Sequence, residues 1–355
     1  MKYPYLLISD THYHAWHQFS HVNEDGISSR LKITLDETKR AVKMLKDVGG
    51  SLLVHAGDAF HVRGEIAPTV LNPVADCYAW IGKQDVNIFM LAGNHDLEGR
   101  EASEVGNAST ILSHVATNAY IVTDQEGRMV TTELIMIPYD HDLNRLRGTL
   151  QAWRDRMPDP KKVDVIIHAP VNGVIKGLPD HGLTPEELAD LGFRRVFAGH
   201  YHNHKELVPG KVYSIGATTH QTWGDVGSRA GFCLVYEDHV KWFCTHAPQF
   251  VDITDMTDDA DIEMAADGNY IRAKIAISAE SEVAEFKAML EKAGAKGWTI
   301  NVERDLTATS RAGSTVSAGA SLEVSVGEFI KHKGYRREVE LSTRCADILG
   351  RAEAA

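Results

Sequence analysis

The sequence predicts an α/β protein made of layered β-sheets flanked by helices, with a small C-terminal α+β accessory domain. Two observations carry this expectation. Short apolar runs alternate with amphipathic stretches over the first 250 residues, which is the pattern of strands and helices that pack in layers. Of the 355 residues, 43% are hydrophobic and 24% are charged. The chain can therefore bury a sizeable core, and it is neither disordered nor fibrous as a whole.

The expected strands are short runs rich in Val, Ile, Leu, Met or Phe. Each run stops at a polar or glycine-containing cluster, which favours a buried strand. Six of these runs come before residue 200, at 5–9, 51–55, 86–91, 133–137, 163–167 and 195–198. The part that follows is richer in strands, with runs at 212–215, 232–236 and 240–243.

Two local signals predict where helices begin between these strands. Thr34 and Glu37 form a capping-box pattern in front of an apolar helical face. Thr184 is followed by Pro185, and proline is favoured at the first position of a helix. We therefore expect helices to start at both places.

The chain beyond residue 250 predicts smaller units after a main domain at 1–250. Residues 251–305 predict the accessory domain, in which an acidic stretch, 252–267, forms a solvated connector and 270–302 gives strand, helix, strand. Residues 306–321 are mostly Thr, Ala, Ser and Gly and predict a flexible loop. Residues 322–355 predict a helical segment, capped by Ser325 and Glu328, that could dock a partner.

Charge and cysteine usage exclude several classes of protein. The chain carries 49 acidic and 37 basic residues, a net charge of −12, so it has no basic arm for nucleic acid. Its four cysteines are scattered and form no CxxC pair, which argues against a zinc ribbon or a disulfide framework. The N-terminal apolar run is too short for a signal peptide, and no run approaches a membrane span. We therefore expect a cytoplasmic protein without a membrane partner.

Five polar clusters follow predicted strands, where an open α/β sheet binds its ligands. Their side chains are the oxygen and nitrogen donors that suit Mn, Fe or Zn ions. One central carboxylate can bridge two ions about 3.5–4 Å apart. The pattern therefore predicts a two-metal site. The clusters are Asp10-Thr11-His12, Gly57-Asp58, Gly93-Asn94-His95-Asp96, His168 and Gly199-His200-Tyr201-His202.

In this order the clusters resemble the motif set of the calcineurin-like metallophosphoesterase superfamily, over residues 10–202. The resemblance implies two divalent ions, with Mn²⁺ expected and Fe²⁺, Zn²⁺ or Mg²⁺ as alternatives. It also implies a catalytic role for His95, with Asp96 orienting its imidazole. The implied ligands are Asp10, His12 and His202 for the first ion, Asn94, His168 and His200 for the second, and Asp58 as the bridge.

Three features resemble DNA repair and recombination nucleases of the SbcD type, from phage or bacteria. His61 lies three residues after Asp58, Asp96 follows His95, and a Gly-Asp pair ends at Asp225. The resemblance implies exonuclease or endonuclease cleavage of DNA, with His61 as a second active-site histidine. It further implies an SMC-like, SbcC-type ATPase partner and a homodimer. We expect Arg63 and Tyr201 to contact substrate.

Other functions remain open at this stage. The same metals could serve a small-molecule phosphodiesterase or phosphomonoesterase, because this scaffold supports many phosphate esters. A second class is a non-catalytic, metal-bound scaffold that recruits the ATPase. A protein phosphatase is disfavoured by Asp96 and His61. We expect the remaining nearby histidines to be surface or supporting residues rather than ligands, namely His14, His17, His21, His55, His204 and His220.

Overall fold

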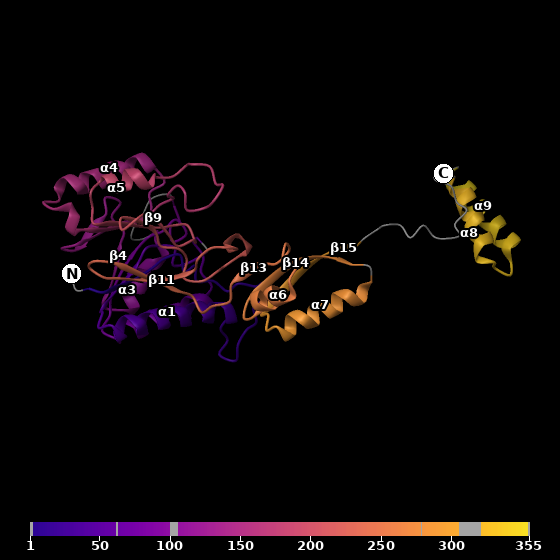
Figure 1. The fold of residues 1–355 in the computed structure, drawn as a ribbon, viewed down its shortest axis with the longest axis horizontal. Coiled ribbons are helices and arrows are strands. Elements are labelled where there is room, and N and C mark those ends of the chain that lie inside the picture. The colour runs from indigo at the N-terminus through magenta and orange to yellow at the C-terminus, as the bar shows by residue number, and fades with distance from the viewer. Residues whose placement is uncertain (1–2, 62, 100–105, 278, 305–320, 354–355) are drawn as a thin grey trace. The chain divides into compact units, whose positions relative to one another are not determined.

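The computed structural model describes residues 3–61, 63–99, 106–277, 279–304 and 321–353 (Figure 1). Its internal contacts divide the chain into two units. The first contains residues 1–273 and 286–301, and the second contains residues 274–285 and 302–355. Both large sheets belong to the first unit.

The first sheet is mainly parallel. Its strands are β1 (Tyr5–Ile8), β2 (Leu52–His55), β3 (Asn87–Leu91), β4 (Ala119–Val122), β11 (Gly231–Val235) and β12 (Val240–Cys244). Their spatial order is β12-β11-β1-β2-β3-β4. Strands β1 to β4 are parallel, whereas β11 runs antiparallel to β1 and to β12. The C-terminal ends of the parallel strands β1, β2 and β3 therefore lie side by side.

The second sheet has the same mixed character. Its strands are β5 (Arg128–Thr131), β6 (Leu134–Ile137), β7 (Asp164–His168), β8 (Arg195–Gly199), β9 (Lys205–Val208) and β10 (Val212–Ser214). They lie in the order β5-β6-β7-β8-β10-β9. The four inner strands are parallel, and β5 and β9 are antiparallel edges. The ends of β7 and β8 are consequently neighbours.

Helices cover the outer faces of the two sheets. They are α1 (Ser29–Asp47), α2 (Pro68–Gly82), α3 (Ile111–Val115), α4 (Leu143–Arg156) and α5 (Pro185–Asp190), with short 3-10 turns η1 (Ala108–Thr110), η2 (Pro160–Lys162) and η3 (Trp223–Asp225). The strands lie between α1 on one side and α4 and α5 on the other (Figure 1). This arrangement gives four layers, in the order helix, sheet, sheet, helix.

The alternation of side chains along β1 explains these layers. Leu6 and Ile8 belong to the core formed with α1 and α2, whereas Tyr5 and Leu7 belong to the core shared by the two sheets. Successive strand residues point to opposite faces, so a strand buried on both faces is apolar throughout. A third core packs α4 and α5 on the second sheet. The expected layered α/β fold is confirmed.

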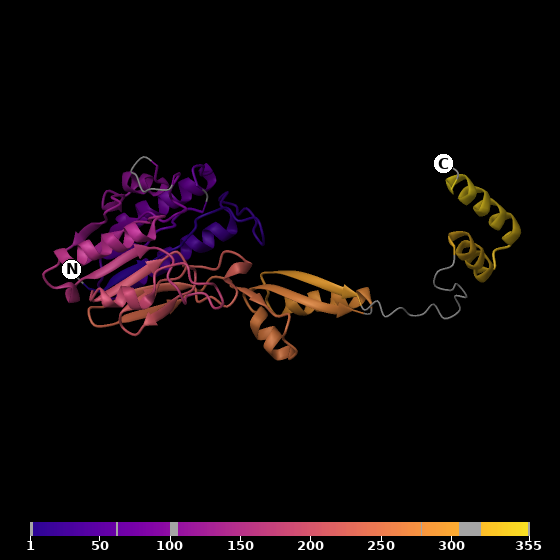
Figure 2. The ribbon, with the colours of Figure 1, turned by 90° about the horizontal axis from the view of Figure 1, so that it is seen from above.

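A small three-stranded sheet follows the main layers, in the order β13-β14-β15. Its elements are β13 (Phe250–Asp252), α6 (Asp259–Ala266), β14 (Tyr270–Ile277), α7 (Glu280–Lys292) and β15 (Gly297–Arg304). Of these elements, β13 and α6 belong to the first unit, and β14, α7 and β15 are divided between the two units. The second unit holds α8 (Leu322–Lys333) and α9 (Glu338–Glu353), which pack on each other as a hairpin (Figure 2). The expected domain bounds at 250, 305 and 321 stay predictions.

The nine strands expected before residue 250 are present, each within one residue of its expected ends. Three helix expectations are wrong. Helix α1 begins at Ser29, so Thr34 lies inside it and its hydroxyl donates to the main-chain oxygen of Arg30. Glu37 instead accepts from Arg40 and from Thr245. The helix expected to start at Thr184 is confirmed, since α5 begins at Pro185 and Thr184 caps it.

The other two differences lie near the C-terminus. The acidic stretch expected as a connector contains α6, because Asp258 caps its first turn by accepting from two main-chain N–H groups, a position where acidic residues favour a helix. Helix α8 begins one turn before Ser325, with Ser321 as its cap. Apart from Ser321, the expected loop at 306–321 lies outside the described residues. Over the part of the chain that the structure describes, no helix is both long and apolar enough to cross a membrane.

Candidate metal centre

The five polar clusters meet at one edge of the two sheets. Asp10 and His12 follow β1, Asp58 follows β2 and Asn94 follows β3. The remaining ligand candidates come from the second sheet, where His168 ends β7 and His200 and His202 follow β8. Because parallel strands end at the same edge, chain segments that are far apart in sequence become neighbours here. Both sheets therefore contribute to one centre.

The backbone at this edge is unusually bent. Asp10, His12, Asp58 and His200 have positive φ angles of 50°, 40°, 55° and 112°. This region is unfavourable for residues with a side chain, and such strain concentrates at functional sites. Gly93 permits the closest approach, since a Cβ atom there would lie 2.2 Å from Asp58 Oδ1. These turns therefore direct polar side chains toward the centre, and the backbone is strained as a result.

The first ligand group consists of Asp10, His12 and His202. The Nε2 atoms of the two histidines lie 3.2 Å apart. The nearer Asp10 oxygen, Oδ1, lies 4.0 Å from His12 Nε2. One donor atom from each of the three residues lies within 4.8 Å of the other two. This group could hold one ion.

The second ligand group consists of Asn94, His168 and His200. The amide oxygen of Asn94 lies 3.1 Å from His168 Nε2 and 2.9 Å from His200 Nδ1. Asp58 stands between the two groups. Its Oδ2 atom lies 3.5 Å from His12 Nε2 and 3.4 Å from His168 Nε2, which is the position that a bridging carboxylate needs.

These spacings fit metal ligands. Two donors that each lie about 2.1 Å from one ion, at about 90–110°, are about 3.0–3.4 Å apart. Six donor pairs, four within the two groups and one from Asp58 to each group, span 2.9–4.0 Å. The donor set of imidazole nitrogen, carboxylate and amide oxygen suits Mn, Fe and Zn ions. The residues present therefore fit two divalent ions.

A carboxylate supports the first ligand group. Asp225, in η3, lies 2.7 Å from His202 Nδ1 through its Oδ1 atom, and its Oδ2 accepts from the main-chain N–H groups of Gln221 and Thr222. Burial opposes ionisation of Asp225, but His202 and these N–H groups outweigh it and lower its pKa to about 2. The charged carboxylate fixes the imidazole so that Nε2 faces the other ligands.

The second ligand group is supported by main chain instead. The Nδ1 atom of His168 donates to the main-chain oxygen of Ala56 at 2.8 Å. His168 is fully buried, which opposes its protonation, yet Asp58 beside it raises its pKa to about 9. For Asp58, burial acts in the opposite sense to its histidine neighbours, and His168 and His12 hold its pKa well below the usual range. Burial, followed by His168, lowers the pKa of His200 to about 3.

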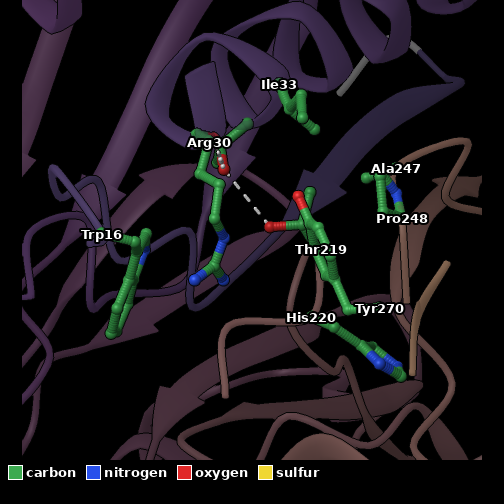
Figure 3. Close-up of a pocket in the computed structure, with 9 residues that line it drawn as sticks. Trp16, Arg30, Ile33, Thr219, His220, Ala247, Pro248 and Tyr270 are labelled. Carbon is green, nitrogen blue, oxygen red and sulfur yellow. Dashed lines mark hydrogen bonds between the residues drawn. The ribbon is translucent and has the colours of Figure 1, made fainter. Parts of the chain in front are cut away.

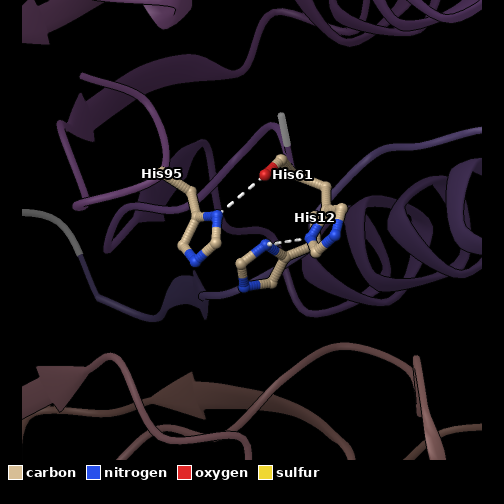
Figure 4. A group of neighbouring side chains, drawn as sticks. All are labelled: His12, His61 and His95. Atoms are coloured by element: carbon tan, nitrogen blue, oxygen red, sulfur yellow. Dashed lines mark hydrogen bonds between the residues drawn. The ribbon is translucent and has the colours of Figure 1, made fainter. Parts of the chain in front are cut away.

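Two further histidines stand beside the centre (Figure 4). The rings of His61 and His95 are stacked, with centroids 5.4 Å apart and planes at 13°. The His95 ring also lies 4.8 Å from that of His12, and His61 Nδ1 lies 3.4 Å from His12 Nδ1. Burial, and then His14, lowers the pKa of His61 to about 4. Near neutral pH, His61 is therefore uncharged.

The expected role of Asp96 differs from its observed contacts. We expected Asp96 to orient the imidazole of His95, but His95 Nδ1 donates to the main-chain oxygen of His61 at 2.7 Å. The buried Asp96 carboxylate accepts from the main-chain N–H groups of Phe60 and Gly93. A carboxylate that ties two main-chain N–H groups together stabilises the turns rather than the ring. Asp96 thus shapes the loop that carries His95.

The two expected substrate contacts lie further out. Arg63 is exposed. Tyr201 lies between two ligand histidines in sequence, is partly buried, and its hydroxyl is 2.9 Å from His181 Nε2. It lines a cavity of about 580 Å³ that also touches His200, His202 and the 222–228 loop.

The histidines that we did not expect to be ligands lie outside the ligand groups among the described residues. His55 is fully buried and its Nε2 atom is 3.1 Å from the Thr11 hydroxyl, so it supports the turn between Asp10 and His12. From the sequence, no supporting role was predicted for Asp225 or for the main-chain oxygen of Ala56. The Gly-Asp pair after the last ligand motif is a signal for the first, and nothing in a sequence marks the second.

A layered α/β fold with this donor set is compatible with a metal-dependent phosphoester hydrolase. The family model described as calcineurin-like phosphoesterase matches residues 3–204, more than half of the chain. The protein belongs to this family, and the expected superfamily is thereby confirmed. No curated protein shows significant similarity to the chain.

Two solved structures are reported for comparison. A dimetal phosphatase from Danio rerio aligns with 10% identity and a TM-score of 0.38, over 68% of this chain and 99% of its own. The Pseudomonas putida nuclease MPE aligns with 15% identity and a TM-score of 0.30, over 67% of this chain and 87% of its own.

Proposed function

We propose that the protein is a two-metal phosphodiesterase that hydrolyses DNA, as an SbcD-like exonuclease or endonuclease in recombination or repair. The observation that carries the proposal is the stacked pair His61 and His95 beside the ligand groups. A spacing of three residues between Asp58 and His61 is the motif that resembles DNA nucleases. Without that pair, the centre would support phosphoester hydrolysis in general.

The residues present support such a reaction. Bound at the two ligand groups, divalent ions would supply positive charge to phosphoryl oxygens and acidify water, with Mn²⁺ as the proposed ion. The main-chain oxygen of His61 can only accept, so Nδ1 of His95 carries a proton and Nε2 is the atom that can exchange one with a leaving oxygen. The uncharged His61 can hydrogen-bond a phosphoryl oxygen next to it.

A comparison of two substrates tests this function. We expect the full chain with Mn²⁺ to degrade labelled linear DNA and to cleave bis-p-nitrophenyl phosphate. His95→Asn keeps a hydrogen-bonding side chain but cannot exchange a proton, so both rates should fall about 10²–10⁴-fold. His114→Asn, an exposed histidine on α3, is the matched control and should keep full activity.

The outcomes separate the rival functions. If the ester is cleaved and DNA is not, hydrolysis at the centre stands and the DNA proposal fails for the isolated chain. If His95→Asn is as active as the unchanged protein, the role of His95 is wrong. If neither substrate is cleaved although Mn²⁺ binds, the non-catalytic scaffold gains support.

A small phosphoester is the second candidate substrate. The cavity of about 580 Å³ beside His200, Tyr201 and His202 is large enough for a small ligand, since such sites span about 300–1,000 Å³. The net charge of −12 also opposes tight DNA binding by the chain alone. Tyr201→Ala should raise KM for the small ester more than for DNA if the cavity holds the ester, and should raise both KM values or neither if it does not.

We propose that α8 and α9 dock on an SMC-like ATPase of the SbcC type. Leu322, Val339 and Ile348 are each at least 64% exposed, and exposed apolar side chains of this kind mark interaction sites. Val339→Lys with Ile348→Lys should weaken binding to the purified ATPase at least about tenfold, with ester hydrolysis unchanged. Calorimetry measures the first and the ester assay the second; equal affinities would refute the docking proposal.

A homodimer and a cytoplasmic location also remain proposals. The dimer follows only from the resemblance to SbcD-type nucleases. Light scattering of the full chain tests it directly, because a dimer has twice the mass of the 39.2 kDa chain. A monomer over the whole concentration range would contradict it.

A further inference from the structure

One buried cation in the first unit is not part of the ligand groups. Arg30, on α1, is 5% exposed and lines a small pocket with Trp16, Thr219 and Tyr270 (Figure 3). Among its described contacts the guanidinium meets two main-chain oxygens and three aromatic rings, and no carboxylate. Asp225 interacts with the guanidinium electrostatically without direct contact, and a buried charge that lacks a directly paired counter-charge is unfavourable. The contacts that hold the guanidinium lead to both sides of the metal centre.

The first set of contacts leads to His61. The guanidinium carbon of Arg30 lies 5.2 Å from the centre of the Trp16 ring, and Nη1 donates to the main-chain oxygen of Gln18 at 3.3 Å. Trp16 also contacts His61, with ring centroids 4.5 Å apart. His61 in turn stacks on His95. The Trp16 ring therefore packs against the His61 imidazole and restricts its position.

The second set leads to the first ligand group. Nη2 of Arg30 donates to the main-chain oxygen of Gln221 at 2.6 Å. The side chain of Gln221 donates to the main-chain oxygen of Asp10 at 2.7 Å, and its main-chain N–H donates to Asp225 at 2.7 Å. Asp225 holds His202. Two residues of the first ligand group therefore depend on the position of Gln221.

Two aromatic rings from the small sheet also contact the guanidinium. Its carbon lies 5.0 Å from the Phe250 ring, on β13, and 5.5 Å from the Tyr270 ring, on β14. Planar stacking and a rigid fork of donors are properties of arginine that lysine lacks. Only a planar group can face these rings while its edge donates in two directions, to Gln18 and to Gln221.

We propose that Arg30 is a positioning residue for the metal centre. By donating to the segment at residues 16–18 and to Gln221, it sets the distance between His61 on one side and His202 on the other. The proposal rests on phosphodiester hydrolysis at that centre, whichever substrate is used.

Arg30→Lys tests the proposal, because it keeps the charge and removes the planar fork. For bis-p-nitrophenyl phosphate we expect kcat to fall about 10–100-fold with KM changed less than about threefold, since small misplacements of reacting groups have effects of this size. Mn²⁺ affinity of the first ligand group should fall about tenfold, the lower end of the effect of a lost supporting contact. Calorimetry measures the latter without turnover.

Arg40→Lys is the matched control. Arg40 lies on the same helix, its guanidinium carbon is 4.9 Å from the Phe232 ring, and it also donates to a main-chain oxygen, that of Cys244. Its contacts lead away from the ligand groups. Activity and Mn²⁺ affinity should stay within about twofold of the unchanged protein. Equal losses in both variants would mean that any arginine of α1 with such contacts has this effect, which overturns the proposal.

A double-mutant cycle separates positioning from general stability. Trp16→Ala removes the contact between Arg30 and the neighbour of His61 but leaves the one through Gln221, so Arg30→Lys should lower kcat by a smaller factor in that background than in the unchanged protein. A merely structural role of Arg30 would multiply the two losses in full. Trp16→Phe keeps a ring and should recover most of the activity lost by Trp16→Ala.

Fluorescence gives a readout that needs no substrate. The chain has six tryptophans, so the emission of Trp16 is obtained by subtracting the spectrum of Trp16→Phe. This emission should shift to longer wavelength in Arg30→Lys, because the indole loses a neighbour and gains water. If DNA is not cleaved but the ester is, the DNA function fails and the Arg30 proposal stands. Unchanged kcat, Mn²⁺ affinity and Trp16 emission in Arg30→Lys would overturn the Arg30 proposal alone.

Discussion

The two ligand groups are built differently although they share Asp58. In the first group, His202 has a side chain that is 27% exposed and is held by the carboxylate of Asp225. In the second, His168 is fully buried at the end of β7 and is held by the main-chain oxygen of Ala56, which follows β2 in the other sheet. The first group thus has a ligand that is fixed by a side chain, and the second has one that is fixed by main chain.

This difference indicates which metal ligand a single substitution can displace. A ligand fixed by main chain moves only if the sheet moves, whereas a ligand fixed by a side chain can be altered by one substitution. Variants of supporting residues should therefore affect the first group alone. Variants of the shared carboxylate should affect both.

Asp58→Asn should have the largest effect, because it removes the charge that lies 3.5 Å from His12 and 3.4 Å from His168. We expect turnover of bis-p-nitrophenyl phosphate to fall more than about 1,000-fold, since the loss of one electrostatic contact in an active site reaches this size. Calorimetry should show weaker Mn²⁺ binding at both groups. Asp36→Asn, an exposed carboxylate on α1, is the control and should behave like the unchanged protein. Loss at one group only would show that Asp58 is not shared.

Asp225→Asn should separate the two groups. It keeps the size of the side chain but removes the charge that fixes His202, so affinity at the first group should fall about 10–100-fold. The second binding event in the same titration is the internal control and should be unchanged. If both events weaken equally, the groups are coupled more tightly than their separate supports suggest.

His55 should reveal how protonation loosens the support of the first group. Burial lowers its pKa from 6.5 to about 3, so in that range the unfolded chain binds a proton that the folded chain does not. Its contribution to stability is complete above pH 6.5 and is lost as pH falls towards about 3, at about 1.4 kcal/mol per pH unit. Urea unfolding of metal-free protein at several pH values measures this slope. His55→Gln should have the shallower slope, and identical slopes would refute the assignment.

The interior of the fold could be predicted because its strands are buried on both faces. Runs such as Leu52–His55 and Leu134–Ile137 are apolar at every or nearly every position, which leaves a clear signal. Strands β4, β5 and β9 were not expected. The residues of β5 and β9 are partly or largely exposed at sheet edges, so they lack the apolar run of a buried strand, whereas β4 is an edge strand of four residues with only Ile121 and Val122 buried.

The candidate ligand residues could be predicted from the sequence, but their supports could not. Motif order points to Asp10, His12 and His168 because each stands at or just after the end of a strand. The partner of His95 is a main-chain oxygen of His61, and every residue has such an oxygen. Arg30 lies about 190 positions from Gln221 in sequence, and only the packing of α1 against the later loop brings them together. Contacts of this kind depend on the folded topology.

Each ligand group draws residues from both sheets, Asp10 and Asn94 from the first and His202 and His168 from the second. An ion held at either group would therefore join the two sheets in the manner of a cross-link. Ligands that bind only the folded chain add stability by mass action, about 2.7 kcal/mol each at a concentration 100 times the dissociation constant. The lifetime of the folded protein in a cell would then follow the supply of the metal, and starvation for it would expose the inter-sheet core to proteases.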